Sequence, residues 1–175
     1  MLFAKYETDN YMRYSNKADK FFALLSTIVC ILMLSASLTF AAERKPVEVK
    51  LSDKCPVCGM FVAKYKNWQA QIHFADGSYA VFDGPKDMFR YLLDLKKYDP
   101  SKKVSDIANV YATEYYAAQM TDARKLFYVQ GSNVMGPMGA ELVPLASEAK
   151  AKEFLTDHKG KKVLKFNEVT GEYLK

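Results

Sequence analysis

Histidine, cysteine and tryptophan are scarce in this chain of 175 residues, which contains two, three and one of them respectively. Three cysteines are too few for a disulfide-dense mini-protein, and two histidines exclude a histidine-rich metal site. The net charge of +5 is too small to indicate a nucleic-acid-binding protein. We find no Ser–His–Asp set, no paired carboxylates and no P-loop, so the sequence predicts that the protein is not an enzyme.

A long apolar run without charges, FFALLSTIVCILMLSASLTF, occupies residues 21–40. Basic residues precede it and Ala41 follows, which is typical of a secretory signal peptide, although the length also suits a single membrane anchor. We therefore interpret residues 1–41 as a signal peptide or membrane anchor, and both alternatives predict that the rest of the chain is exported. Cys30 lies inside the run and follows Val29, which is not the small residue that a lipoprotein cleavage site requires, so we interpret Cys30 as apolar filler.

The sequence of the exported part predicts an α+β fold of two small ββαβ units, each a short sheet backed by one helix. Residues 42–53 are polar and rich in lysine, and we interpret them as a linker. The first unit is expected over residues 54–118 and the second over residues 119–175. The predicted strands are 68–74, 78–82, 108–113, 125–130, 141–145 and 162–166, and the predicted helices are 84–96 and 148–158.

Local signals support these elements. The alternating residues 68–74 lead to the turn signal Asp76-Gly77, which indicates a hairpin. Asp83 is expected to cap the first helix, with a proline in the first turn, and Ser147 is expected to cap the second. Pro144 has no backbone N–H to donate to a neighbouring strand, which predicts that 141–145 is an edge strand.

The densest chemical signal is the segment Cys55-Pro56-Val57-Cys58-Gly59-Met60. A redox dithiol would normally begin a helix, and β-branched and aromatic residues follow this motif instead. A zinc site would need further ligands, and haem attachment would need a histidine where Gly59 stands. A structural disulfide and a soft-metal site stay open, the latter because a thiolate and a thioether together select Cu(I), and thiol-disulfide exchange is kept as the alternative function.

A second sulfur-bearing segment, Met135-Gly136-Pro137-Met138-Gly139, lies in a turn-rich loop. Its neighbours are too small to bury two methionines, so packing alone explains them poorly. If the two halves pack so that this loop meets Cys58 and Met60, one cysteine and two or more methionines would form a Cu(I) site. His73, on a predicted strand, is a further candidate because copper also accepts imidazole.

In their order and spacing these segments resemble the NosL family of nitrous-oxide-reductase accessory proteins. The resemblance covers about residues 54–169. The matching stretches are Cys58-Gly59-Met60, Ala70-Gln71-Ile72, Phe82-Asp83-Gly84, Asp122-Ala123-Arg124-Lys125, residues 128–132, residues 135–139, Val143-Pro144 and Phe166-Asn167-Glu168-Val169.

The resemblance implies a periplasmic Cu(I) chaperone that serves denitrification. Such a protein supplies copper for the copper-sulfide centre of nitrous oxide reductase and works with a membrane ABC transporter. Carried over residue by residue, the family motif implies Cys58, Met60 and Met138 as metal ligands. Cys55, Met135 and His73 are additional candidates.

Cys55 is a thiol that some family members lack. Its presence leaves open whether one or two thiolates bind the metal and whether a disulfide between Cys55 and Cys58 gates the site. The alternative function is a thiol-disulfide exchange module built on these two cysteines.

Overall fold

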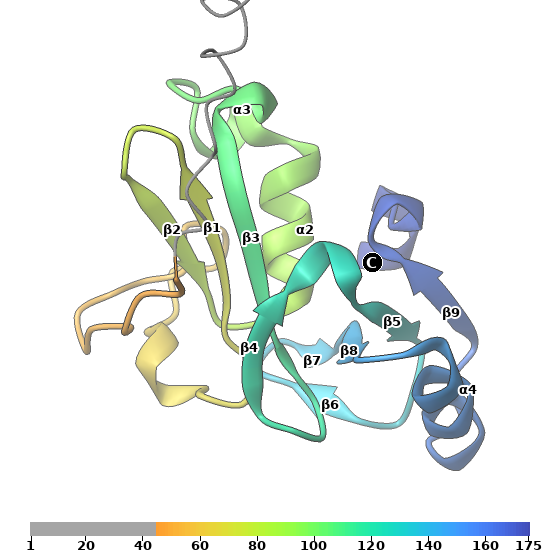
Figure 1. Ribbon diagram of the computed structural model, residues 1–175. Helices are drawn as coiled ribbons and strands as arrows, with labels where there is room; N and C mark the ends of the chain where they lie inside the picture. The colour runs from red at the N-terminus through yellow and green to blue at the C-terminus, as the bar shows by residue number, and fades with distance from the viewer. Residues whose placement is uncertain (1–44) are drawn as a thin grey trace, which may run out of the picture. The chain divides into compact units, whose positions relative to one another are not determined.

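The computed structural model describes residues 45–175 (Figure 1). The predicted signal or anchor at residues 1–41, including the apolar run 21–40 and Cys30, lies outside the described residues. Among residues 45–175, no helix has both the length and the apolar character needed to cross a membrane.

Two antiparallel sheets carry most of the strands (Figure 1). The first has the order β2-β1-β3-β4, formed by β1 (Ala70–Phe74), β2 (Tyr79–Phe82), β3 (Ile107–Glu114) and β4 (Gln119–Asp122). The second has the order β8-β5-β9, formed by β5 (Phe127–Gln130), β8 (Val143–Leu145) and β9 (Lys162–Lys165). A separate hairpin pairs β6 (Met135–Gly136) with β7 (Gly139–Ala140).

The helices connect strands of one sheet. Helix α2 (Pro85–Leu93) and the single turn α3 (Leu95–Tyr98) lie between β2 and β3, and α4 (Glu148–Asp157) lies between β8 and β9. Short 3-10 turns occupy Val62–Lys64, Val104–Asp106, Ala123–Lys125, Phe166–Glu168 and Gly171–Leu174.

The predicted α+β fold with its repeated strand–strand–helix–strand order is confirmed. In each sheet the first strand is central, its hairpin partner lies on one side, and the strand that follows the helix lies on the other. Strand β4 and the β6–β7 hairpin are additions that the sequence pattern did not predict. Strand β4 extends the first sheet by pairing with β3, so that sheet reaches Asp122.

Helix α2 is shorter than the predicted helix over 84–96. It ends at Leu93 because Asp94 leaves the helical region with φ −134° and ψ 55°. The second helix agrees with its prediction, since the Ser147 hydroxyl accepts a hydrogen bond of 3.2 Å from the Lys150 N–H. Strand β8 lies at a sheet edge, as its proline predicted.

All five residues of β1 are buried because both faces of this central strand are covered. Ile72 and its same-face neighbours join the main core. On the opposite face Gln71 exchanges two hydrogen bonds, of 2.9 and 2.8 Å, with the backbone of Val47. Val47 and Val49 pack partly buried against the core, so this part of the segment interpreted as a linker is anchored on the sheet.

Helix α2 packs against residues of both halves. On one side the Tyr91 ring lies edge-on to Phe82 of the first sheet, with centroids 5.2 Å apart. On the other side the Phe89 ring meets Tyr128 of β5 and Phe166, with both centroid distances 5.0 Å. Fully burying one such aromatic side chain stabilises a fold by about 2–3 kcal/mol. The first turn of α2 is therefore placed where segments from both halves can reach it.

Candidate metal centre

The CxxCGM segment forms a closed loop before the first sheet. The Cys55 N–H donates to the Met60 carbonyl at 2.8 Å, and the Gly59 N–H donates to the Cys55 carbonyl at 2.8 Å. Gly59 has φ +78°, the left-handed conformation that glycine adopts without strain. Cys55 is buried and Cys58 half-buried, and both are free thiols.

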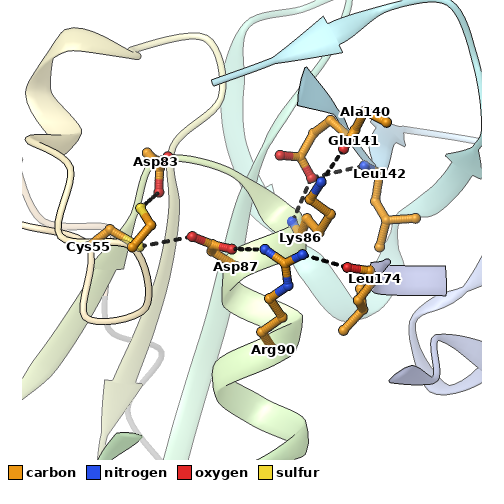
Figure 2. A network of polar contacts seen from close by, with 10 residues as sticks. Cys55, Asp83, Lys86, Asp87, Arg90, Ala140, Glu141, Leu142 and Leu174 are labelled. Atoms are coloured by element: carbon orange, nitrogen blue, oxygen red, sulfur yellow. Dashed lines mark hydrogen bonds and ion pairs between the residues drawn. The ribbon is translucent and has the colours of Figure 1, made fainter. Parts of the chain in front are cut away.

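Two aspartates from the start of α2 face these thiols. The Cys58 thiol donates to Asp83 Oδ1 at 3.3 Å, and the Cys55 thiol donates to Asp87 Oδ2 at 3.5 Å. One donor atom from each of the four residues can be chosen so that all lie within 4.8 Å of one another. Figure 2 shows the side chains of Asp83 and Asp87 directed toward the cysteine loop, with a dashed line from Cys55 to Asp87. At this spacing the four side chains could hold one metal ion between them.

The prediction that Asp83 caps the first helix is wrong. The N-cap residue is Gly84, which makes no side-chain cap hydrogen bond, and Pro85 begins the helix. The Asp83 side chain instead turns to the cysteine loop, because its Oδ1 accepts from the Cys58 thiol. Its other oxygen, Oδ2, is buried and is the single side-chain polar atom among residues 45–175 that is both buried and without a hydrogen-bond partner.

Asp87 is fixed from its other side by Arg90. Arg90 Nη1 lies 2.8 Å from Asp87 Oδ1, and Arg90 Nη2 donates to the Leu174 carbonyl at 2.6 Å (Figure 2). The guanidinium thus connects the carboxylate to the C-terminal 3-10 turn. Because both ends of this bridge are hydrogen-bonded, the orientation of the Asp87 carboxylate is restricted.

Burial raises the pKa of both thiols. The pKa of Cys58 rises to about 11, mainly through burial and in part through the hydrogen-bonded carboxylates of Asp87 and Asp83. Burial raises the pKa of Cys55 further still, with Asp83 contributing. Both groups are thiols at neutral pH, so a metal ion must displace their protons. A raised pKa also argues against an activated redox dithiol, whose attacking thiol has a depressed pKa.

The second sulfur-bearing segment is a hairpin in the structure, where the sequence predicted a loop. Met135 begins β6, and Met138 lies in the turn between Gly136 and Gly139. Both methionine side chains are exposed, Met135 by 62% and Met138 by 43%. Exposed methionines on a tight hairpin do not fill the core.

Glu141 connects this hairpin to the first turn of α2. Its Oε1 accepts hydrogen bonds from the N–H of Lys86 at 2.7 Å and from the N–H of Leu142 at 2.9 Å. The Lys86 ammonium donates to the Ala140 carbonyl, as Figure 2 shows. Burial raises the pKa of Glu141 to about 7. The hairpin and the cysteine loop therefore both contact the first turn of the same helix.

The structure brings two of the predicted site residues into one cluster and places His73 outside it. Cys55 and Cys58 belong to the thiol–carboxylate cluster, and Met60 follows in the same loop, half-buried. His73 lies on β1 outside that cluster, with Nε2 2.9 Å from Gln71 Oε1 and its ring edge-on to Tyr111 at 5.5 Å.

Three acidic residues of the site were not recognised from the sequence, namely Asp83, Asp87 and Glu141. A signal was present for the first two, since carboxylates four residues apart across a helix start can face the same partner. Glu141 gave no such signal because its contacts to α2 span 55 residues of chain.

Comparison with known proteins supports the resemblance seen in the motifs. The copper-binding lipoprotein NosL of Stutzerimonas stutzeri is 29% identical over 157 residues, which are 82% of this chain and 78% of that protein. The crystal structure of the copper chaperone NosL from Shewanella denitrificans superposes with a TM-score of 0.62 at 21% identity, covering 73% of this chain and 97% of that one. The solution structure of apo-NosL from Achromobacter cycloclastes is 25% identical with a TM-score of 0.43, covering 60% of this chain and 87% of that one.

The family comparison covers almost all of the described chain. The NosL family model matches residues 46–174, which run from the segment that Gln71 holds on β1, through both sheets, to the C-terminal 3-10 turn. The chain belongs to the NosL family.

Proposed function

We propose that this protein is an exported Cu(I) chaperone and that Cys58, Met60 and Met138 bind the metal. The observation that supports the proposal is that the cysteine loop and the end of the methionine hairpin both contact the first turn of α2. The cysteine loop reaches the first turn of α2 through Asp83 and Asp87, and the methionine hairpin reaches it through Glu141.

The donor chemistry supports monovalent copper. Thiolate and thioether ligands select Cu(I) over harder cations. Cys58 is half-buried and Met138 is 43% exposed, so the proposed ligands remain open to solvent on one side. An open site with few ligands suits delivery, since an acceptor's ligands can enter before the chaperone's ligands leave.

Family membership supports a role in copper delivery. The relatives are named as a copper-binding lipoprotein and a copper chaperone, which favours export and metal transfer over catalysis. We propose that the acceptor is a periplasmic cuproenzyme, namely nitrous oxide reductase, and that the copper is used to build its copper-sulfide centre. A membrane ABC transporter is the proposed accessory partner, and residues 1–41 would direct export.

Anaerobic titration with Cu(I) against a competing chelator tests the site. The reduced wild-type protein, purified from an exporting host, should bind one Cu(I) tightly. Cys58→Ser should weaken binding by at least about 100-fold, and Met60→Leu or Met138→Leu by at least about tenfold, because each removes a direct ligand and the loss of an outer-shell partner alone costs about 10–100-fold in metal affinity. Met120→Leu on β4 is the matched control and should bind like the wild type. Unchanged affinity in Cys58→Ser would overturn the proposal.

Transfer is tested separately from binding. The Cu(I)-loaded protein should donate copper to apo nitrous oxide reductase when its membrane partner is present, and Met138→Leu should change the transfer rate more than Met120→Leu. A loaded protein that binds Cu(I) tightly but never passes it to the reductase would refute the client assignment and leave the metal site intact.

A further inference from the structure

We propose that the methionine hairpin is an oxidation site, at which a peroxide converts Met135 and Met138 to sulfoxides and thereby reversibly blocks copper loading. The inference rests on the proposed function, because it takes Met138 as a ligand of Cu(I). Oxidation of the hairpin would then control the site independently of the supply of metal.

The two hairpin methionines are the most exposed of the five in residues 45–175. Met135 is 62% exposed and Met138 43% exposed. Met60 and Met120 are half-buried, and Met88 is fully buried beneath the first sheet's helix. A peroxide must reach the sulfur atom to react with it, so exposure sets the order in which methionines are oxidised. The structure therefore predicts selective oxidation of the hairpin.

The backbone of the hairpin keeps these side chains open to solvent. Gly136 pairs with Gly139, so Met138 lies in the tight turn between them. A Cβ on Gly139 would meet nothing within 4 Å, and Ala140 beyond it is exposed as well. By contrast, the sulfur of the half-buried Met120 lies 4.0 Å from the Thr113 hydroxyl on the neighbouring strand. The turn thus offers free access to a small oxidant.

The oxidation is an oxygen-atom transfer. The sulfur lone pair attacks one oxygen of hydrogen peroxide, an S–O bond forms as the O–O bond breaks, and one water molecule leaves. The sulfur loses two electrons, which the peroxide gains. A sulfoxide is a weaker donor to soft Cu(I), because its oxygen withdraws electron density from the sulfur. Methionine sulfoxide reductases restore the thioether with two electrons from a dithiol and release the oxygen as water.

Oxidation of the hairpin should leave the fold intact. A sulfoxide is polar, so it disrupts a core when the methionine is buried there. Met135 and Met138 already face solvent, so their sulfoxides remain hydrated. The change should therefore affect metal binding at Met138 without unfolding the protein, which is what a reversible block requires.

Timed treatment of the metal-free, reduced protein with hydrogen peroxide tests the site. Peptide mass spectrometry should show Met135 and Met138 each gaining one oxygen while Met60 and Met88 are unmodified. Catalase then removes the peroxide and a phosphine reduces the thiols. Cu(I) affinity should fall by at least about tenfold, the loss expected for removal of one ligand. Methionine sulfoxide reductases A and B together should restore it, and the circular dichroism spectrum should not change.

Three variants separate the two hairpin methionines. Met135→Leu leaves Met138 to be oxidised and should still lose Cu(I) affinity on treatment. Met138→Leu should lose no further affinity on treatment, because its thioether is already absent. Met120→Leu on β4 is the matched control and should respond to peroxide like the wild type.

The outcomes distinguish this inference from the proposed function. Oxidation of Met60 or Met88 ahead of Met138 would overturn the inference and leave the copper site untouched. Wild-type affinity in protein oxidised at Met138 would also overturn it alone, provided that untreated Met138→Leu binds Cu(I) more weakly. Wild-type affinity in untreated Met138→Leu would instead overturn the assignment of Met138 as a ligand, and the inference with it.

Discussion

Glu141 Oε1 accepts a hydrogen bond of 2.7 Å from the backbone N–H of Lys86 in the first turn of α2. The same oxygen accepts from the N–H of Leu142, so one carboxylate oxygen joins the strand after the methionine hairpin to the helix that carries Asp83 and Asp87 at its start. First-turn N–H groups have no partner within their helix, and an acceptor from elsewhere satisfies one of them. The relative position of the two sulfur-bearing segments therefore depends on this buried carboxyl group.

Glu141 should make the stability of the protein depend on pH. Its pKa is about 7 in the folded state, against an ordinary value near 4.5, so the folded protein holds a proton that the unfolded chain releases. This stabilisation is complete below about pH 4.5 and is lost as the pH rises through about 7. From the shift, the contribution is of the order of 3 kcal/mol.

Urea unfolding at pH 5 and pH 8.5 measures this contribution. Glu141→Gln keeps an oxygen acceptor without the titration, so the wild type should lose more unfolding free energy between the two pH values than the variant does. Taking the difference between the proteins removes the effect of the other titrating groups. Equal losses in both would show that Glu141 titrates normally in the folded state.

Gly84 is expected to tolerate no side chain. A Cβ at this position would overlap Glu141 Oε2, and Oε1 of the same group is fixed by two hydrogen bonds, so the carboxyl cannot simply turn away. Gly84→Ala should destabilise the protein by about 1–3 kcal/mol, the usual range for overpacking. Gly171→Ala is the control, because a Cβ there meets nothing within 4 Å. Thermal unfolding of the two variants gives the comparison, and equal midpoints would contradict the expectation.

Much of the fold could be predicted from local sequence signals. The turn at Asp76-Gly77, the cap at Ser147 and the edge proline Pro144 each act over a few residues, and the structure agrees with them. The exception is Asp83, whose cap interpretation followed from the same local rule. Its carboxylate instead faces a thiol 25 residues earlier in the chain, and no short-range rule contains that contact.

The candidate site was predicted only in part for the same reason. The sulfur residues formed recognisable motifs, so Cys58, Met60 and Met138 were selected from the sequence. The acidic residues that surround or position them act across 25 to 55 residues of chain. Strand β4 was missed because Gln119–Asp122 is mostly polar, and it forms by adding to the edge of β3.

Two glycines with positive φ provide matched tests of the sulfur-bearing segments. Gly59 has φ +78° and Gly139 has φ +83°, and a Cβ at either position would meet nothing within 4 Å. Alanine at each should therefore cost about 1–2 kcal/mol through backbone strain alone. If both segments supply metal ligands, each variant should also weaken Cu(I) binding in the chelator competition. Gly171→Ala, without positive φ, again serves as the control, and wild-type Cu(I) affinity in Gly139→Ala would argue against a role for the hairpin.

Phe89 should connect the stability of the two halves. Its ring contacts Tyr128 of β5 and Phe166, while the helix that carries it packs on the first sheet. Phe89→Ala should destabilise the protein by about 3–5 kcal/mol, because a buried aromatic leaves a cavity. Leu93→Ala on the same helix is the control, since Leu93 is 53% exposed and should cost about 0.5 kcal/mol. Unfolding followed by far-ultraviolet circular dichroism and by tyrosine fluorescence should show one shared transition that shifts as a whole in Phe89→Ala. Two separate transitions, with only one of them shifted, would show that the halves unfold independently and that Phe89 does not couple them.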